Sequence, residues 1–135
     1  MSDCLFCRIS SKDAAAEIVH ESPGAVAFLD AHPAARGHVL VIPRTHAPTL
    51  LELGDAAIGE LFRTVKIVQG KMLASLQPRG FNVGWNHGRA AGQFVFHLHV
   101  HIIPRYHLLG RGIQVLGGGG GREDLGAVAA AIRGA

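Results

Sequence analysis

Three histidines alternate with apolar residues in the segment His97-Leu98-His99-Val100-His101-Ile102-Ile103. Strict alternation is typical of a half-buried β-strand, because successive side chains point to opposite faces. We therefore expect a strand over residues 97–103 that buries Leu98, Val100 and Ile102 in the core. The three imidazoles would then share the other face. Same-face neighbours lie roughly 6.5 to 7 Å apart, so one phosphate-sized group can touch more than one of them.

This histidine row is hard to explain by core packing alone, because burying three imidazoles without partners is costly. Imidazole can donate, accept or attack near neutral pH, and it can also bind a metal ion. The row alone therefore leaves two hypotheses open. It is either a catalytic site for a phosphorylated substrate or a site in which the histidines themselves hold a metal.

The only two cysteines, Cys4 and Cys7, have C-x-x-C spacing. They are too few for a disulfide scaffold, and a redox motif normally follows a strand, whereas these precede every expected strand. Half of a zinc site is the favoured interpretation, provided that two further ligands are found. A pair of thiols without metal is the alternative.

The elements that must position these residues follow from short apolar runs and turn signals. Strands are expected over 17–20, 25–29, 38–42 and 80–85, besides the histidine strand, and a loop of about seven residues joins the second to the third as a hairpin. Residues 4–10 predict a turn or short helix. Apolar spacing predicts one long amphipathic helix over about 55–76, which Pro78 stops, and a short helix over 125–132. The fold class is α+β, with a mostly antiparallel five-stranded sheet.

Length and charge narrow the class of protein. The 135 residues, 48% of them hydrophobic, predict one domain over 1–135, with a core over 1–110. Residues 111–135, with a five-glycine run at 117–121, predict a flexible tail and the short helix. Thirteen scattered Lys and Arg give a net charge of only +3, which suits a small anion rather than a nucleic acid polymer. We expect no membrane span, no signal peptide and a cytoplasmic location.

A glycine-rich loop over residues 86–93, Asn-His-Gly-Arg-Ala-Ala-Gly-Gln, leads directly into the histidine segment. Glycines let backbone N–H groups approach an anion closely. A plain hairpin connection is the ordinary explanation of such a loop. Its place directly before the histidines favours a role in binding phosphate.

The pattern of residues 97–103 resembles the His-φ-His-φ-His-φ-φ signature of the histidine-triad family, where φ is apolar. The Gly92-Gln93 pair before it, Ile103-Pro104-Arg105 after it, the segments 28–30 and 37–43, and the N-terminal C-x-x-C are similar to the bacterial zinc-containing branch. The resemblance spans residues 4 to about 106. It implies a small α+β fold, a homodimer with a continuous sheet, and nucleotide hydrolase or nucleotidyl transferase activity on a purine nucleotide.

His99 is the best candidate for a nucleophile, because a histidine on each side can orient the phosphate. One of its ring nitrogens must attack, so the other should carry the proton and donate it in a hydrogen bond to a fixed acceptor such as a backbone carbonyl. The resemblance implies the same role, with a transient nucleotidyl-histidine and release of a nucleoside monophosphate by water. It also implies that His101 holds an α-phosphate oxygen and that His38 supports its hydrogen bonds. Gln93 and Asn86 would contact the phosphate or the leaving group.

The resemblance further implies that Asp30 accepts from the ribose hydroxyls and that Phe6, Ile9 and Phe28 form an apolar wall around the base. A turn cap and ordinary core packing are the alternatives for these residues. One position departs from the family. Many relatives carry a small hydroxyl residue directly after the Gly-Gln pair, whereas this chain has Phe94, so phosphate contacts there must come from backbone N–H groups.

The resemblance also completes the metal site, because it pairs Cys4 and Cys7 with His46 and His97. Two thiolates and two imidazoles make a closed tetrahedral site for one structural zinc per chain, with no open position for catalysis. Such a site would attach the N-terminus to the sheet while the other two histidines of the row stay free.

Three functions remain as hypotheses. The leading one is hydrolysis of a nucleoside phosphoramidate or related substituted nucleotide at the α-phosphorus, with a dinucleoside polyphosphate as an alternative substrate. The second is a nucleotide-binding or partner-binding protein with little turnover. The third is a zinc module built on the histidine row. An intact triad accompanied by Gln93 and Asn86 favours the first, because a pure binder needs no nucleophile.

Overall fold

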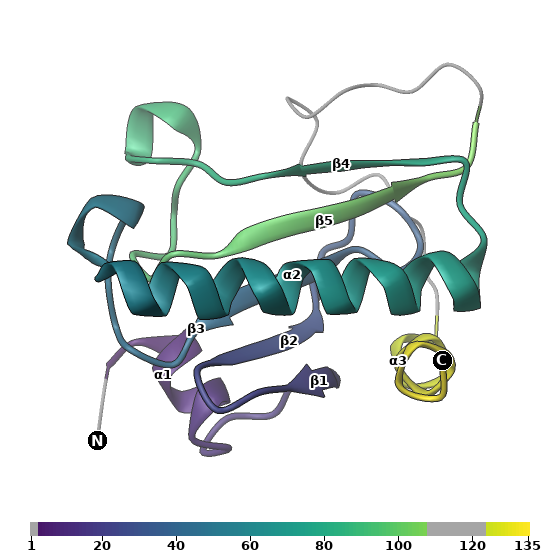
Figure 1. Ribbon diagram of the computed structural model, residues 1–135, viewed down its shortest axis with the longest axis horizontal. Helices are drawn as coiled ribbons and strands as arrows, with labels where there is room; N and C mark the ends of the chain where they lie inside the picture. The colour runs from purple at the N-terminus through teal and green to yellow at the C-terminus, as the bar shows by residue number, and fades with distance from the viewer. Residues whose placement is uncertain (1–2, 108–123) are drawn as a thin grey trace.

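The computed structural model describes residues 3–107 and 124–135 (Figure 1). One antiparallel sheet has the strand order β1-β2-β3-β5-β4. Its strands are β1 (Ile18–Glu21), β2 (Ala25–Leu29), β3 (Val39–Pro43), β4 (Gly80–Gly84) and β5 (Val100–Arg105). The helices are α1 (Leu5–Ser10), α2 (Asp55–Leu76) and α3 (Leu125–Arg133), with 3₁₀ turns at Leu50–Glu52 and Arg89–Ala91. The predicted α+β class, five-stranded sheet, long helix and short C-terminal helix are confirmed.

Helix α2 covers one face of the sheet, with α3 beside it near β1 (Figure 1). The apolar stripe of α2 is fully buried at Leu61, Val68 and Met72, as the helical spacing of these residues predicts. The helix ends where Gln77 adopts a left-handed conformation with φ of 52°, one residue before Pro78. Among the described helices, none is long and apolar enough to cross a bilayer.

The central strands β2 and β3 are buried along their whole length because both faces are covered. On the α2 side they contribute Ala25, Ala27, Leu29, Val39 and Val41 to the larger core. On the opposite side Val26, Phe28, Leu40 and Ile42 pack with Phe6 and Ile9 of α1. Continuous apolar runs such as these are therefore two-sided strands, and α1 forms part of a second, smaller core.

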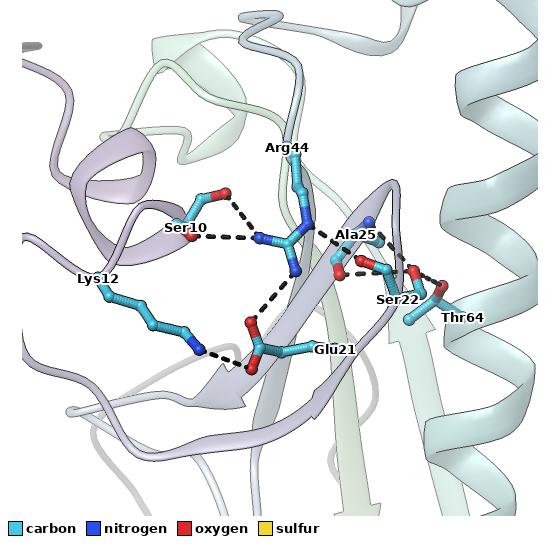
Figure 2. A network of polar contacts seen from close by, with 7 residues as sticks. All are labelled: Ser10, Lys12, Glu21, Ser22, Ala25, Arg44 and Thr64. Atoms are coloured by element: carbon cyan, nitrogen blue, oxygen red, sulfur yellow. Dashed lines mark hydrogen bonds and ion pairs between the residues drawn. The ribbon is translucent and has the colours of Figure 1, made fainter.

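Helix α1 has only six residues, which is too short for stability by itself. Figure 2 shows how its C-terminal end is anchored by Arg44, which follows β3. The guanidinium donates to the Ser10 carbonyl at 3.2 Å, to the Ser22 carbonyl at 3.0 Å and to Glu21 at 3.2 Å. Glu21 also pairs with Lys12 at 3.1 Å. One planar cation thus joins α1 to the turn between β1 and β2.

The histidine segment differs from its predicted strand, because β5 begins at Val100 rather than at His97. The backbone N–H of Leu98 donates to the Ala47 carbonyl at 2.8 Å, outside the sheet ladder, and residues 95–97 form a bend. The predicted burial of Leu98, Val100 and Ile102 in the core is nevertheless confirmed. His97 and His99 therefore lie before the strand and only His101 lies in it, so the three imidazoles do not form one regular row.

Other boundaries agree within one residue. The strands expected at 17–20, 38–42 and 80–85 are Ile18–Glu21, Val39–Pro43 and Gly80–Gly84, and the last helix extends to Arg133 rather than 132. Pro43 closes β3 as its last residue, where its missing N–H costs little and its carbonyl remains available. The glycine run at 117–121, and with it most of the predicted tail, lies outside the described residues.

Candidate active site

A cavity of about 750 Å³ opens on the α1 side of the sheet. It brings together seven of the predicted site residues from four separate segments of the chain. These are Phe6, Ile9, Phe28, Asp30, Asn86, His99 and His101. His38 and Gln93 do not line it. The cavity also has wall residues that no sequence motif singled out, chiefly Leu40 of β3 and Leu125 at the start of α3, because only the folded chain brings these segments together.

His99 is held in one tautomer. Its Nδ1 lies 2.8 Å from the backbone carbonyl of His97, and a carbonyl can only accept, so Nδ1 carries the proton. The lone pair is then on Nε2 of a ring that lines the cavity. Burial lowers the pKa of His99 below its usual value, against opposing effects of the His97 carbonyl and Asp30. The imidazole is therefore neutral near pH 7 and can attack an electrophile.

His101 is held in the opposite tautomer by a chain of hydrogen bonds. The Ala34 N–H donates to Nδ1 of His38 at 2.9 Å, which places the proton of His38 on Nε2. That Nε2–H donates to Nδ1 of His101 at 2.9 Å. The proton of His101 is thus on its own Nε2, which is buried and has no acceptor among the described residues. A buried donor without a partner is costly, and an anionic ligand oxygen would satisfy it.

Both members of this pair are neutral. Burial, with a further contribution from the neighbouring histidines, lowers the pKa of His38 to about 3 and that of His101 to about 4. Neutral rings keep the donor and acceptor pattern that Ala34 starts. The ring centroids of His99 and His101 lie 5.2 Å apart, so a free lone pair and a free N–H stand side by side.

Asp30 lies at the end of β2 and lines the same cavity. One carboxylate oxygen accepts from the backbone N–H of His32 at 2.9 Å, and the other lies 3.6 Å from Nε2 of His38. Burial raises the pKa of Asp30, although the His32 N–H and the nearby imidazoles oppose the shift. The carboxylate retains acceptor sites for hydroxyl groups of a ligand.

Gln93, which we expect to contact the phosphate or the leaving group, is held by hydrogen bonds within the chain. Its side chain is buried, its amide N–H groups donate to the carbonyls of Pro48 at 2.7 Å and Val95 at 3.1 Å, and its Oε1 accepts from Gly88. Both amide N–H groups have a backbone carbonyl as partner, so this side chain holds three loop segments together. The preceding Gly92 adopts φ of 98°, where a side chain would be strained and would meet the Asn86 amide.

Phe94 follows, with a side chain that lines the cavity and is 74% exposed. Within the described part of the chain, neither its backbone N–H nor that of Val95 has an acceptor. The bend therefore offers backbone donors where the sequence lacks the hydroxyl residue of relatives.

The metal cluster predicted from the sequence is assembled. Nε2 of His97 lies 2.7 Å from the Pro43 carbonyl and must donate to it, so Nδ1 carries a lone pair. That Nδ1 lies 3.4 Å from Sγ of Cys4 and 3.5 Å from Sγ of Cys7, and Nδ1 of His46 lies 3.3 Å from Sγ of Cys7. In a tetrahedral zinc site, a sulfur ligand and a nitrogen ligand lie about 3.5 Å apart. The four side chains fit one zinc ion.

A second group, Asp30, His38 and His101, also brings its ligand atoms within 4.8 Å of one another. Here the two facing ring nitrogens are 2.9 Å apart and share a hydrogen. Among residues 3–107 and 124–135, no metal-binding group contains the three histidines of the row together. The hypothesis of a metal held by the row alone is therefore not favoured.

Comparison with known proteins agrees with this geometry. The HIT domain matches residues 11–108 of the chain. A Bacillus subtilis protein named "Protein hit" is 39% identical over 104 residues, which is 77% of this chain and 72% of that protein. Adenosine 5′-monophosphoramidase hnt1 of Schizosaccharomyces pombe is 40% identical over 102 residues, 76% and 74% of the two chains.

One similar solved structure is of a zinc-bound protein. The crystal structure of a zinc-bound histidine triad family protein from Mycobacterium smegmatis has a TM-score of 0.83 and 31% identity, and covers 98% of this chain and 91% of its own. The fold, the paired histidine tautomers and the extent of the HIT match lead to one assignment. This chain belongs to the HIT family of histidine-triad proteins.

Proposed function

We propose that this protein hydrolyses a purine nucleoside phosphoramidate, or a related nucleotide substituted at its α-phosphorus, through a covalent nucleotidyl-His99 intermediate. One observation carries the proposal. His99 has a free lone pair and His101 a free, buried N–H, side by side in a cavity with an apolar wall. The family includes a relative that is named an adenosine 5′-monophosphoramidase.

In the first step, the Nε2 lone pair of His99 attacks the α-phosphorus and forms the N–P bond. The bond from phosphorus to the leaving nitrogen breaks, and the amine departs with that electron pair and takes a proton from water. Because Nδ1–H of His99 already donates to the His97 carbonyl, the positive charge that develops on the ring is stabilised there. Water then attacks the same phosphorus, loses a proton to solvent, and releases the nucleoside monophosphate with His99 restored.

Negative charge on the non-bridging oxygens needs donors in fixed positions. Nε2–H of His101 supplies one, with its direction set by His38 and Ala34. The free backbone N–H groups of Phe94 and Val95 supply others, with the Asn86 side chain at the same cavity. We place Gln93 as a positioning residue, because its amide fixes the loop that carries these N–H groups.

The nucleoside would occupy the buried part of the cavity. Phe6, Ile9 and Phe28 form a wall that suits a flat base, and the Phe6 and Phe28 rings pack edge to face at 5.4 Å. Asp30 would accept from the ribose hydroxyls. A ribonucleoside offers two hydroxyl donors to this carboxylate and a 2′-deoxyribonucleoside only one, so the ribonucleoside should be preferred.

Zinc, when bound by Cys4, Cys7, His46 and His97, would be structural, because four protein ligands leave no open position. The site joins α1 to the bend before β5 and leaves His99 free of metal. We also propose that the chain forms a homodimer through β4, an edge strand that exposes Val83 and is followed directly by the exposed Trp85. Sedimentation velocity at micromolar concentration distinguishes the dimer from a monomer.

The test is mass spectrometry of the intact protein, quenched rapidly without acid during turnover of adenosine 5′-phosphoramidate. Wild type should gain one adenylyl mass and release AMP, whereas His99→Ala should do neither and still bind AMP. His20→Gln, at a histidine outside the cavity, is the matched control and should behave as wild type. Equal AMP release by His99→Ala would exclude the nucleophile. A wild type that binds AMP but releases none from the substrate would be a binding protein.

A further inference from the structure

Phe94 is exposed in an unusual place. Exposed aromatic side chains are ordinary on a protein surface, but this one, 74% exposed, lines the cavity that contains His99. Its neighbour Val95 packs against the core around Phe6 and Phe28, whereas Phe94 belongs to neither core. Within the described residues its ring also has no aromatic or cationic partner. The ring is therefore mostly exposed, lies outside both described cores and is available to a ligand.

The position of Phe94 relates it to the phosphorus. Its own backbone N–H is one of the free donors of the bend, so an α-phosphate bound there lies next to the Phe94 residue itself. The nucleoside is assigned to the buried wall that contacts His99 through Phe6, with ring centroids 5.1 Å apart. The other large substituent on the phosphorus, the leaving group, then has the open part of the cavity with Phe94, Asn86 and Gly92.

We propose that Phe94 is a specificity residue that stacks on the leaving group, and that the preferred substrates carry a flat aromatic ring on the amine attached to the α-phosphorus. This inference rests on the proposed function. The ring of Phe94 would contact a phenyl or indole group joined to the leaving nitrogen by a short alkyl link. The bond that breaks is still the P–N bond, and the aromatic amine leaves with its electron pair and takes a proton from water.

The experiment compares kcat/KM for three adenosine 5′-phosphoramidates. One is unsubstituted, one carries 2-phenylethylamine, and one carries 2-cyclohexylethylamine, which matches the second in size but is not flat. Wild type should prefer the phenyl over the cyclohexyl substrate by about two- to tenfold, the range that one aromatic contact gives. Phe94→Leu should lose this ratio, and Phe94→Tyr should retain it. The unsubstituted substrate gives the reference kcat/KM of each protein, so that a general loss of activity is separated from a change in the phenyl-to-cyclohexyl ratio.

Leu51 provides the matched control, because it is 81% exposed and lies outside the cavity. Leu51→Ala should keep the wild-type ratio. The same ratio in wild type and Phe94→Leu would overturn the proposal. Failure of wild type to hydrolyse even the unsubstituted substrate would instead overturn the proposed function. Diadenosine tetraphosphate and adenosine tetraphosphate are tested as a second pair of substrates. A Phe94-dependent preference for diadenosine tetraphosphate, without a preference between the two amines, would assign the ring to a second nucleobase and overturn the proposal of an aromatic amine.

Discussion

Acidification from pH 7 to pH 5 should destabilise the fold through the pair His38 and His101. Both rings are buried, and their pKa values are about 3 and about 4 in the folded protein, against 6.5 for a free histidine. At pH 5 the unfolded chain therefore binds a proton at each position and the folded chain binds almost none. Stability then rises with pH between the folded and unfolded pKa values, and falls as the solution is acidified.

As long as the pH stays above the pKa of each histidine in the folded protein, the loss of unfolding free energy depends only on its pKa in the unfolded chain. At pH 5 the solution is 1.5 units below 6.5. At about 1.4 kcal/mol per unit, each ring costs about 2 kcal/mol of unfolding free energy. The pair costs about 4 kcal/mol, a large part of the 5–15 kcal/mol that is typical of a domain. Above pH 6.5 the contribution should level off.

The assay is urea unfolding at pH 7 and pH 5, with a chelator in every sample so that loss of metal does not contribute. His38→Gln keeps an N–H donor toward His101 but does not titrate, so it should lose about 2 kcal/mol less than wild type between the two pH values. His87→Gln, at an exposed histidine, should lose as much as wild type. Identical losses in wild type and His38→Gln would refute the assignment of a buried neutral pair.

Two further predictions concern α1. Cys4→Ser combined with Cys7→Ser should reduce bound zinc from one equivalent per chain to a trace and lower the Tm. Part of the activity should remain, because His99 is not among the proposed metal ligands. Unaltered zinc content by elemental analysis would exclude these ligands. Arg44→Gln should raise KM for the nucleotide severalfold with little change in kcat, because it releases the end of α1 that carries Ile9. Arg44→Lys should restore part of the loss. Steady-state kinetics that show a fall in kcat alone would contradict this prediction.

Local patterns predicted the regular elements because those elements depend on local physics. The stripe that ends at Leu76 and the break at Pro78 fix α2 without any knowledge of its neighbours. The start of β5 depends instead on a distant group. The alternation at His97 to His99 is that of a strand, but the Leu98 N–H has the Ala47 carbonyl as its partner, and no pattern within the segment encodes that contact.

The roles of polar side chains divide in the same way. Residue type and resemblance named His99, His101 and the metal ligands, which the fold brings together as expected. Gln93 could not be assigned from its type, because an amide serves a phosphate and a backbone carbonyl equally well, and only the path of the loops decides. The tautomer of His101 likewise depends on the Ala34 N–H two hydrogen bonds away, which is a property of the loop before β3.

The proposed metal site and the proposed nucleophile meet at one residue. The His97 ring faces Cys4 and Cys7 through Nδ1, while its backbone carbonyl accepts the hydrogen bond from Nδ1–H of His99 that leaves the lone pair on Nε2. Its Nε2–H is fixed to the Pro43 carbonyl, so ring and peptide are held from two sides. Phe6, between the two cysteines in sequence, packs edge to face on both His97 and His99. A zinc ion bound as we propose would therefore act on the proposed catalysis without performing chemistry, because fixing His97 fixes its carbonyl, and the carbonyl keeps the lone pair of His99 on Nε2.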